Sequence, residues 1–143
     1  MHSDRLQRIM ELKERLMEEK ERLLDQHINR RDIIYSNIEL LDNEININYS
    51  ELCTRCLDSN DFYVLKDYLE HLGRLKTEAL TQKELIETKI AEIRAELVEM
   101  LREIKVLDTL KERTLSTARR AQNKKHQKLL DEIALRLESR KTQ

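Results

Sequence analysis

The residues of this chain that could do chemistry are two cysteines, four histidines and one dense group of basic side chains. Cys53 and Cys56 form a C-x-x-C motif. Such a motif binds zinc or exchanges electrons when a second ligand pair or a strand-to-helix setting accompanies it. Neither accompanies it here. We therefore interpret the two cysteines as small residues near a turn, in a chain kept in a reducing compartment.

The histidines and glycines give no sign of a catalytic or metal site. His2, His27, His71 and His126 lie far apart in the sequence and share no spacing typical of metal ligands. A loop that cradles phosphate needs clustered glycines, and the chain has one glycine. We expect a protein without enzymatic activity, cofactor or bound metal.

The strongest charge asymmetry lies between Lys111 and Lys128, where seven basic residues stand against the single acid Glu112. The other five basic residues of the segment are Arg113, Arg119, Arg120, Lys124 and Lys125. The net charge of the whole chain is -1, so the excess is local. The segment could dock on an acidic protein surface, form a solvated helix face or contact nucleic-acid phosphates. No aromatic residue is interleaved for base stacking, so we do not expect nucleic acid as the partner.

The composition predicts that long helices position these residues. Aromatic residues make up 3% of the chain and charged residues 38%, with one glycine and no proline. Such a chain has little material for tight turns and consists largely of good helix formers. No apolar run approaches the roughly 20 residues that span a bilayer, and Met1 to Leu12 has no signal-peptide core. We expect a cytoplasmic protein without membrane insertion.

Apolar residues recur at alternating steps of three and four along two segments, which indicates two heptad seams. The first seam contains Met10, Met17, Leu24, Ile34, Ile38, Leu41, Ile45 and Leu52. The second contains Phe62, Leu65, Leu69, Leu72, Ala79, Ile86, Ile90, Ile93, Leu97, Met100, Ile104 and Leu107. Basic side chains interrupt the seams at Lys13, Lys20, His27, Arg31, Lys76 and Lys83. Their aliphatic stems can cover a seam while the charges reach water.

The residues that favour turns and helix N-termini, from Asp58 to Asp61, separate the two seams. We therefore predict an all-α fold: one long antiparallel two-helix coiled-coil hairpin over residues 1–143. Helix one runs over about 3–56, a turn over about 57–60 and helix two over about 61–140. With this turn, facing residues have numbers that sum to about 117, which pairs Ile45 with Leu72 and Met17 with Met100.

Helix two is longer than helix one. Helix one begins near Ser3, which lies opposite about Thr114 in the predicted register. The residues from about 115 onward therefore project as an unpaired, overhanging C-terminal helix on the order of 40 Å long, at 1.5 Å per residue. This overhang contains most of the basic segment.

Four residues near the turn lie just beside the seams: Tyr35, Tyr49, Tyr68 and Leu75. Such flanking residues can simply widen the core. Alternatively they form an exposed apolar strip for a partner protein, because tyrosine is enriched at interfaces.

The chain resembles the flagellar FliJ family, the small coiled-coil component of the bacterial flagellar type III export ATPase complex. The resemblance is sharpest where 107–111 leads into the basic helix that ends in 130–134, and weaker around Tyr68, Leu69 and Leu72. It implies a stalk like the central subunit of rotary ATPases, peripheral to the inner membrane. A hexameric export ATPase ring would then bind Arg119, Arg120, Lys124, Lys125 and Lys128.

The same resemblance implies binding to a transmembrane export gate and to export chaperones. The matching positions are Tyr35, Tyr49, Tyr68, Leu72 and Leu75. Ile45 stands near a position where relatives can carry an aromatic residue, which weakens this transfer. Three alternatives stay open: the equivalent stalk of a virulence type III secretion system, a nucleic-acid-binding coiled coil, and a generic dimeric scaffold.

Overall fold

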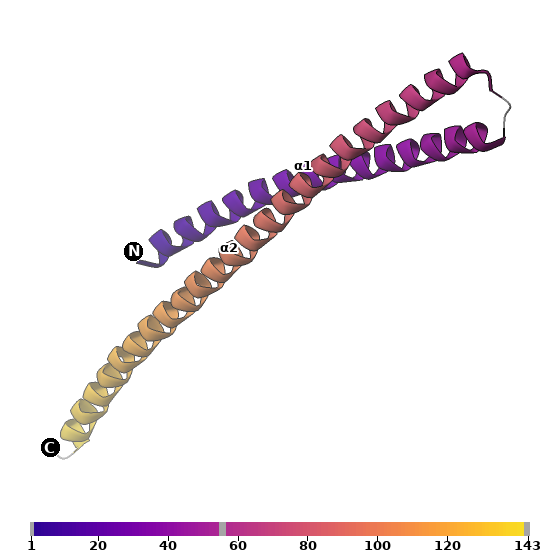
Figure 1. Ribbon diagram of the computed structural model, residues 1–143. Helices are drawn as coiled ribbons and strands as arrows, with labels where there is room; N and C mark the ends of the chain where they lie inside the picture. Colours follow the sequence, from indigo (N-terminus) through magenta and orange to yellow (C-terminus); the bar gives the residue numbers. More distant parts are fainter. Residues whose placement is uncertain (1, 55–56, 142–143) are drawn as a thin grey trace. The chain divides into compact units, whose positions relative to one another are not determined.

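The computed structural model describes residues 2–54 and 57–141, which form two long helices. Helix α1 spans His2–Thr54 and helix α2 spans Ser59–Lys141, and each is continuous (Figure 1). Cys56, the predicted end of helix one, lies outside the described residues. The two helices pack against each other, so the prediction of an all-α two-helix hairpin is confirmed.

Asp58 determines where α2 begins. Its side-chain Oδ1 accepts a hydrogen bond from the backbone N–H of Asp61 at 2.8 Å, and its carbonyl accepts one from the N–H of Phe62 at 3.0 Å. Asp58 is therefore the N-cap residue, and it satisfies a backbone donor that has no partner inside the helix. This cap starts the helix at Ser59, two residues before the predicted start.

The packing divides into two units. Unit 1 combines α1 up to Met17 with α2 from Glu99 onward, and unit 2 comprises the segment from Glu18 to Val98. In each unit a segment of α1 lies antiparallel to a segment of α2.

The core of unit 2 is the predicted seam. Its most buried side chains come from α2 and are Ile93, Ile90, Leu72, Ala79 and Ile86, each at most 7% exposed. The α1 residues of the predicted seam in this unit are half-buried. Burying one such aliphatic side chain is worth roughly 1.5–3 kcal/mol before conformational entropy is subtracted. A run of these layers is what holds the two helix segments of unit 2 together.

Ion pairs across the seam agree with the predicted register. The residue numbers of the partners sum to 116 in Lys20–Glu96 and to 118 in Lys76–Asp42, where the Nζ–Oδ1 distance is 2.6 Å. The lysines are about one-third exposed, and the carboxylates more so. Such solvated pairs contribute at most about 1 kcal/mol each, so they fix register more than they stabilise.

The predicted start of the second seam is wrong. Phe62 is 42% exposed and packs edge-to-face on Tyr63, with 5.9 Å between ring centroids. Leu65 is the first half-buried seam residue of α2. Phe62 lies in the first turn of α2, one turn before this seam residue.

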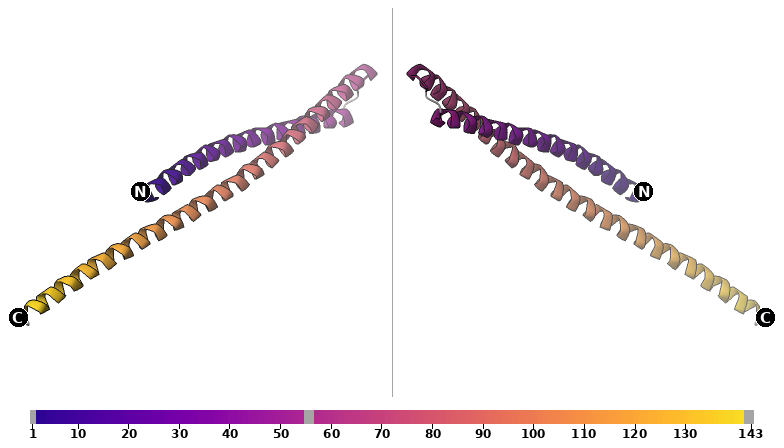
Figure 2. Two further views of the ribbon diagram at one scale, coloured as in Figure 1. Left: turned by 90° about the vertical axis from the view of Figure 1, so that its left-hand side faces the viewer. Right: turned by 90° about the vertical axis from the view of Figure 1, so that its right-hand side faces the viewer.

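In unit 1 the helix pairing ends before α2 does. Met10 is buried, and Lys13 pairs with Glu103 across the seam. Thr114 is the last half-buried residue of α2, and every residue from 115 to 141 is exposed. Both views of Figure 2 draw this stretch as continuous helix. The structure therefore confirms the predicted C-terminal overhang within this unit.

Candidate protein-binding surfaces

The first candidate surface is the exposed helix of residues 115–141, called the basic arm below. No acidic residue lies between Glu112 and Asp131, whereas five basic residues lie on the arm in this interval. These are Arg119, Arg120, Lys124, Lys125 and Lys128, all exposed. The positive charge is therefore undiluted over more than two helical turns.

The basic residues point to several sides of the arm. Arg120, Lys124 and Lys128 follow one another at intervals of four and form one stripe, because a helix turns 100° per residue. Arg119 and Lys125 lie at other angles around the same turns. A partner that meets all five charges must therefore surround the helix. A flat acidic surface would meet only one stripe.

Beyond Lys128, the arm carries an apolar stripe. Leu130, Ile133 and Leu137 follow the i, i+3, i+7 pattern of one helix face and are 45–55% exposed. The basic arm is thus amphipathic near its end, although α1 does not cover it.

The second candidate surface lies in unit 2, and its tyrosines fall on two sides of the seam. The residues predicted for it are Tyr35, Tyr49, Tyr68, Leu72 and Leu75. The Tyr35 hydroxyl donates a hydrogen bond to Glu87, and Lys83 lies over the Tyr35 ring at 5.0 Å. Tyr49 is 14 positions, or two heptads, after Tyr35 and shares its helix face. It is 56% exposed.

The remaining residues that were predicted to bind a partner lie on the other side of the seam or in the core of unit 2. The Tyr68 hydroxyl donates a hydrogen bond to Glu44 at 2.9 Å. Glu44 is seven residues after Asn37, so Glu44 and Asn37 share one face of α1, opposite to the face of Tyr35. Leu75 lines a hollow together with Asn37. Of the two interpretations of Tyr35, Tyr49, Tyr68 and Leu75, a single exposed strip shared by all four is therefore wrong. Leu72 is 4% exposed and can act on a partner only by holding its neighbours in place.

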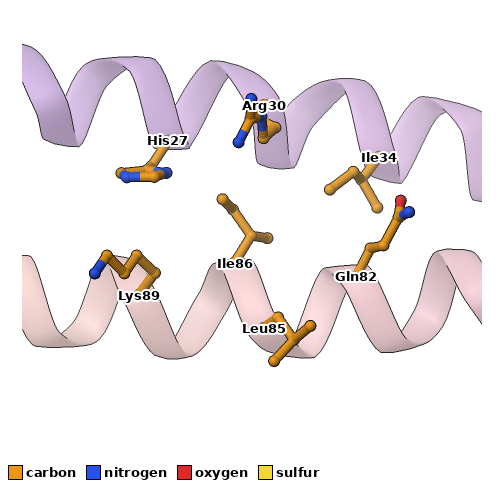
Figure 3. A pocket seen from close by; sticks show the side chains of 7 residues that line it. All are labelled: His27, Arg30, Ile34, Gln82, Leu85, Ile86 and Lys89. Atoms are coloured by element: carbon orange, nitrogen blue, oxygen red, sulfur yellow. The ribbon is translucent and has the colours of Figure 1, made fainter.

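The side of unit 2 that carries Leu75 is hollowed along the two helices. Three open hollows follow one another there, and Gln82 lines all of them. In the hollow drawn in Figure 3, Ile86 points from α2 toward α1, between His27 and Ile34, whereas Leu85 points away. The positions of Asn37 and Gln82 in these hollows were not predicted, because uncharged polar residues beside a seam carry no periodic signal.

The two hydrogen-bonded tyrosines respond to pH. The pKa of Tyr35 and of Tyr68 is raised above the ordinary 10.0, chiefly because each hydroxyl donates to a carboxylate, and further by lost hydration and the carboxylate charge. Both contacts need the protonated phenol. Their stabilising effect is therefore complete below pH 10 and is lost as the pH rises through the raised pKa.

We predict that Tyr35→Phe removes a late component from the absorbance titration of tyrosinate, with a midpoint above pH 10. Tyr68→Phe should remove a second such component. The measurement is the absorbance at 295 nm against pH for both variants and the unmodified chain. If the component lost in either variant has its midpoint below pH 10, the hydrogen bond to the carboxylate does not form in solution.

The residues first considered for chemistry do not come together. Cys53 is exposed, and Cys56 lies outside the described residues. His27 is half-buried on α1, whereas His71 and His126 are exposed on α2. In the described part of the chain, no group of three or more His, Cys, Asp or Glu side chains is placed to hold a metal ion.

Over the described residues, neither helix contains a stretch long and apolar enough to cross a bilayer.

The two paired helices and the exposed basic arm place the chain in the class of two-helix coiled-coil proteins. A family model described as "Flagellar FliJ protein" matches residues 1–143. The chain therefore belongs to the FliJ family and is a flagellar, export-related protein, as its sequence resemblance implied. No curated protein and no solved structure matches it.

Proposed function

We propose that this protein is the non-catalytic stalk of the flagellar type III export apparatus. In this role it couples a hexameric export ATPase to the transmembrane export gate, at the cytoplasmic side of the inner membrane. The observation that carries the proposal is the basic arm, in which every residue from 115 to 141 is exposed. Over the described residues, α1 does not cover residues 115–137 of the arm.

The distribution of charge on the arm supports a ring as its partner. Arg119, Arg120 and Lys125 point to different sides of the helix, so a pore that surrounds the helix can contact all of them at once. In this proposal the pore of the ring is acidic. Long-range attraction between the basic arm and the acidic pore would steer the arm into the ring, and salt would weaken this attraction.

The export gate and the export chaperones would bind unit 2. Tyr68 and Leu75 lie on its hollowed side, and Tyr35 and Tyr49 on the other side. Each of the four is between 36% and 56% exposed, so a partner can bury aromatic and apolar area there. Leu72 supports this surface from the core. The division into two sides allows two partners to bind without competing for one strip.

The test is to add the purified protein to its cognate export ATPase. We expect the protein to promote hexamer assembly, seen by sedimentation, and to raise the rate of ATP hydrolysis at ATPase concentrations where the ring alone assembles poorly. Unchanged assembly and unchanged hydrolysis would contradict the proposed stalk function. Bovine serum albumin at equal mass controls for non-specific stabilisation.

A further inference from the structure

Helix α1 carries a second, outward-facing seam in unit 2. Ile33, Leu40 and Ile47 follow one another at intervals of seven and are 70%, 67% and 62% exposed. They are the most exposed large apolar side chains among the described residues of α1. The positions that complete the 3–4 spacing are Asn29, Ser36, Asn43 and Ser50, all exposed. We call these seven residues the outer seam.

The outer seam is distinct from the seam that packs on α2. Ile34, Ile38, Leu41 and Ile45 are half-buried, whereas Leu40, the neighbour of Leu41, is not covered. An ordinary solvated face of this chain would carry charge, because 38% of its residues are charged. The seven residues of the outer seam carry none. A three-heptad uncharged stripe of this kind is the pattern of a coiled-coil interface.

The flanks of the outer seam are acidic. From residue 32 to residue 54 α1 contains five acidic residues and no basic one. Asp42 pairs with Lys76 of α2 and lies on the other side. The remaining four, Asp32, Glu39, Glu44 and Glu51, border the outer seam. A helix that covers this seam is therefore favoured when its own flanking positions are basic.

A second copy of the chain fits the outer seam poorly. A parallel pair of outer seams would bring Glu39 of one copy toward Glu44 of the other, which is unfavourable for like charges. An antiparallel pair would place Leu40 opposite Asn43 of the other copy, so each apolar residue would face an amide or hydroxyl group. The parallel pair therefore places like charges together, and the antiparallel pair places apolar residues against polar ones.

We propose that the outer seam binds one amphipathic helix of another protein, which packs against α1 on the side away from α2. The partner helix has apolar residues at a spacing of three and four, with Asn, Ser or similar polar residues in alternate layers, and Lys or Arg along both flanks. The outer seam contains no residue of the basic arm and no tyrosine. Its flanking residue Glu44 accepts the hydrogen bond of Tyr68, and Ile33, Ser36 and Leu40 line one of the hollows beside Gln82. Binding of a helix to the outer seam does not require the proposed stalk function.

A synthetic peptide tests the proposal directly. The probe is a fluorescent four-heptad helix with Ile and Asn in alternate core layers and Lys at all flanking positions, and its twin carries Glu there. We expect fluorescence anisotropy to show that the Lys peptide binds the full chain at least about tenfold more tightly than the Glu peptide at low salt. Leu40→Glu should weaken binding of the Lys peptide by about tenfold or more, because it puts a charge in the central layer.

The matched control is Leu85→Glu, at an α2 leucine that is 68% exposed, close to the 67% of Leu40. It should change the affinity by less than about twofold, because its position is not in the outer seam. Circular dichroism should give all three chains equal helix content, since both substituted residues face water. Equal binding of the two peptides, no binding of either, or equal loss in both variants would overturn the proposal. A dimer that Leu40→Glu dissociates in sedimentation would assign the seam to a second copy and would also overturn it.

Discussion

Replacing Ile93 by alanine is expected to lower the free energy of unfolding by about 2–4 kcal/mol, within the range for truncating a buried isoleucine. Ile93 is the most buried side chain among the described residues, at 2% exposed. In the register that sums to 117 it lies opposite Leu24, so its layer is apolar on both sides. Alanine leaves a cavity that two stiff helices close only in part. Urea unfolding followed by circular dichroism at 222 nm measures the loss.

The control for Ile93→Ala is Leu85→Ala, one heptad and one residue earlier on the same helix. Leu85 is 68% exposed, so its truncation should change the free energy of unfolding by less than about 0.5 kcal/mol. Both substitutions introduce alanine into a helix, so the gain in helix propensity is similar. Equal losses in the two variants would mean that the pairing of α1 with α2 in unit 2 does not persist in solution.

The seam through which α1 and α2 pack on each other, here called the inner seam, and the overhang were predictable because both depend only on the spacing of apolar residues and on helix length. Ile86, Ile90 and Ile93 follow the heptad pattern without a break, and they are among the most buried residues. In the register that sums to about 117, the first residues of α1 lie opposite Thr114, the last half-buried residue of α2. A chain with one glycine and no proline offers few alternative turns.

The surfaces beside the seam were harder to predict. Tyr35 and Asn37 are two residues apart and therefore about 200° apart around the helix, so they lie on opposite sides of the seam. Tyr35 and Tyr68 were grouped because both lie just beside a seam. That criterion does not consider on which side of the seam a residue lies. The partners Glu87 and Glu44 depend on side-chain rotamers as well, which spacing does not determine.

The outer seam was present in the sequence but is hidden by its polar layers. Ile33, Leu40 and Ile47 repeat every seven residues, yet Ser36 and Asn43 between them make the stripe look like an ordinary polar face. The burial of the inner seam separates the two patterns. Once Leu41 is assigned to the contact with α2, Leu40 and its heptad neighbours Ile33 and Ile47 are left exposed.

Reversing the five basic charges of the arm that precede Asp131 should abolish the action of the protein on its export ATPase. The variant carries Glu in place of Arg119, Arg120, Lys124, Lys125 and Lys128. Because these residues contact neither α1 nor the core of unit 1, the fold should persist, with unchanged helix content and unchanged urea unfolding. We expect at least about a tenfold loss of stimulated ATP hydrolysis at moderate salt, since like charges now face each other at the docking site.

The matched control for the basic arm changes the net charge by the same amount elsewhere. It carries Glu in place of five exposed basic residues outside the arm: Arg8, Arg15, Arg22, Lys66 and Arg94. This variant should retain more than about half of the stimulation, because only the general attraction between the two proteins is reduced. The comparison separates local docking from net charge. If both variants lose stimulation equally, the arm has no special role in binding the ring, and the ATPase senses only the total charge of the stalk.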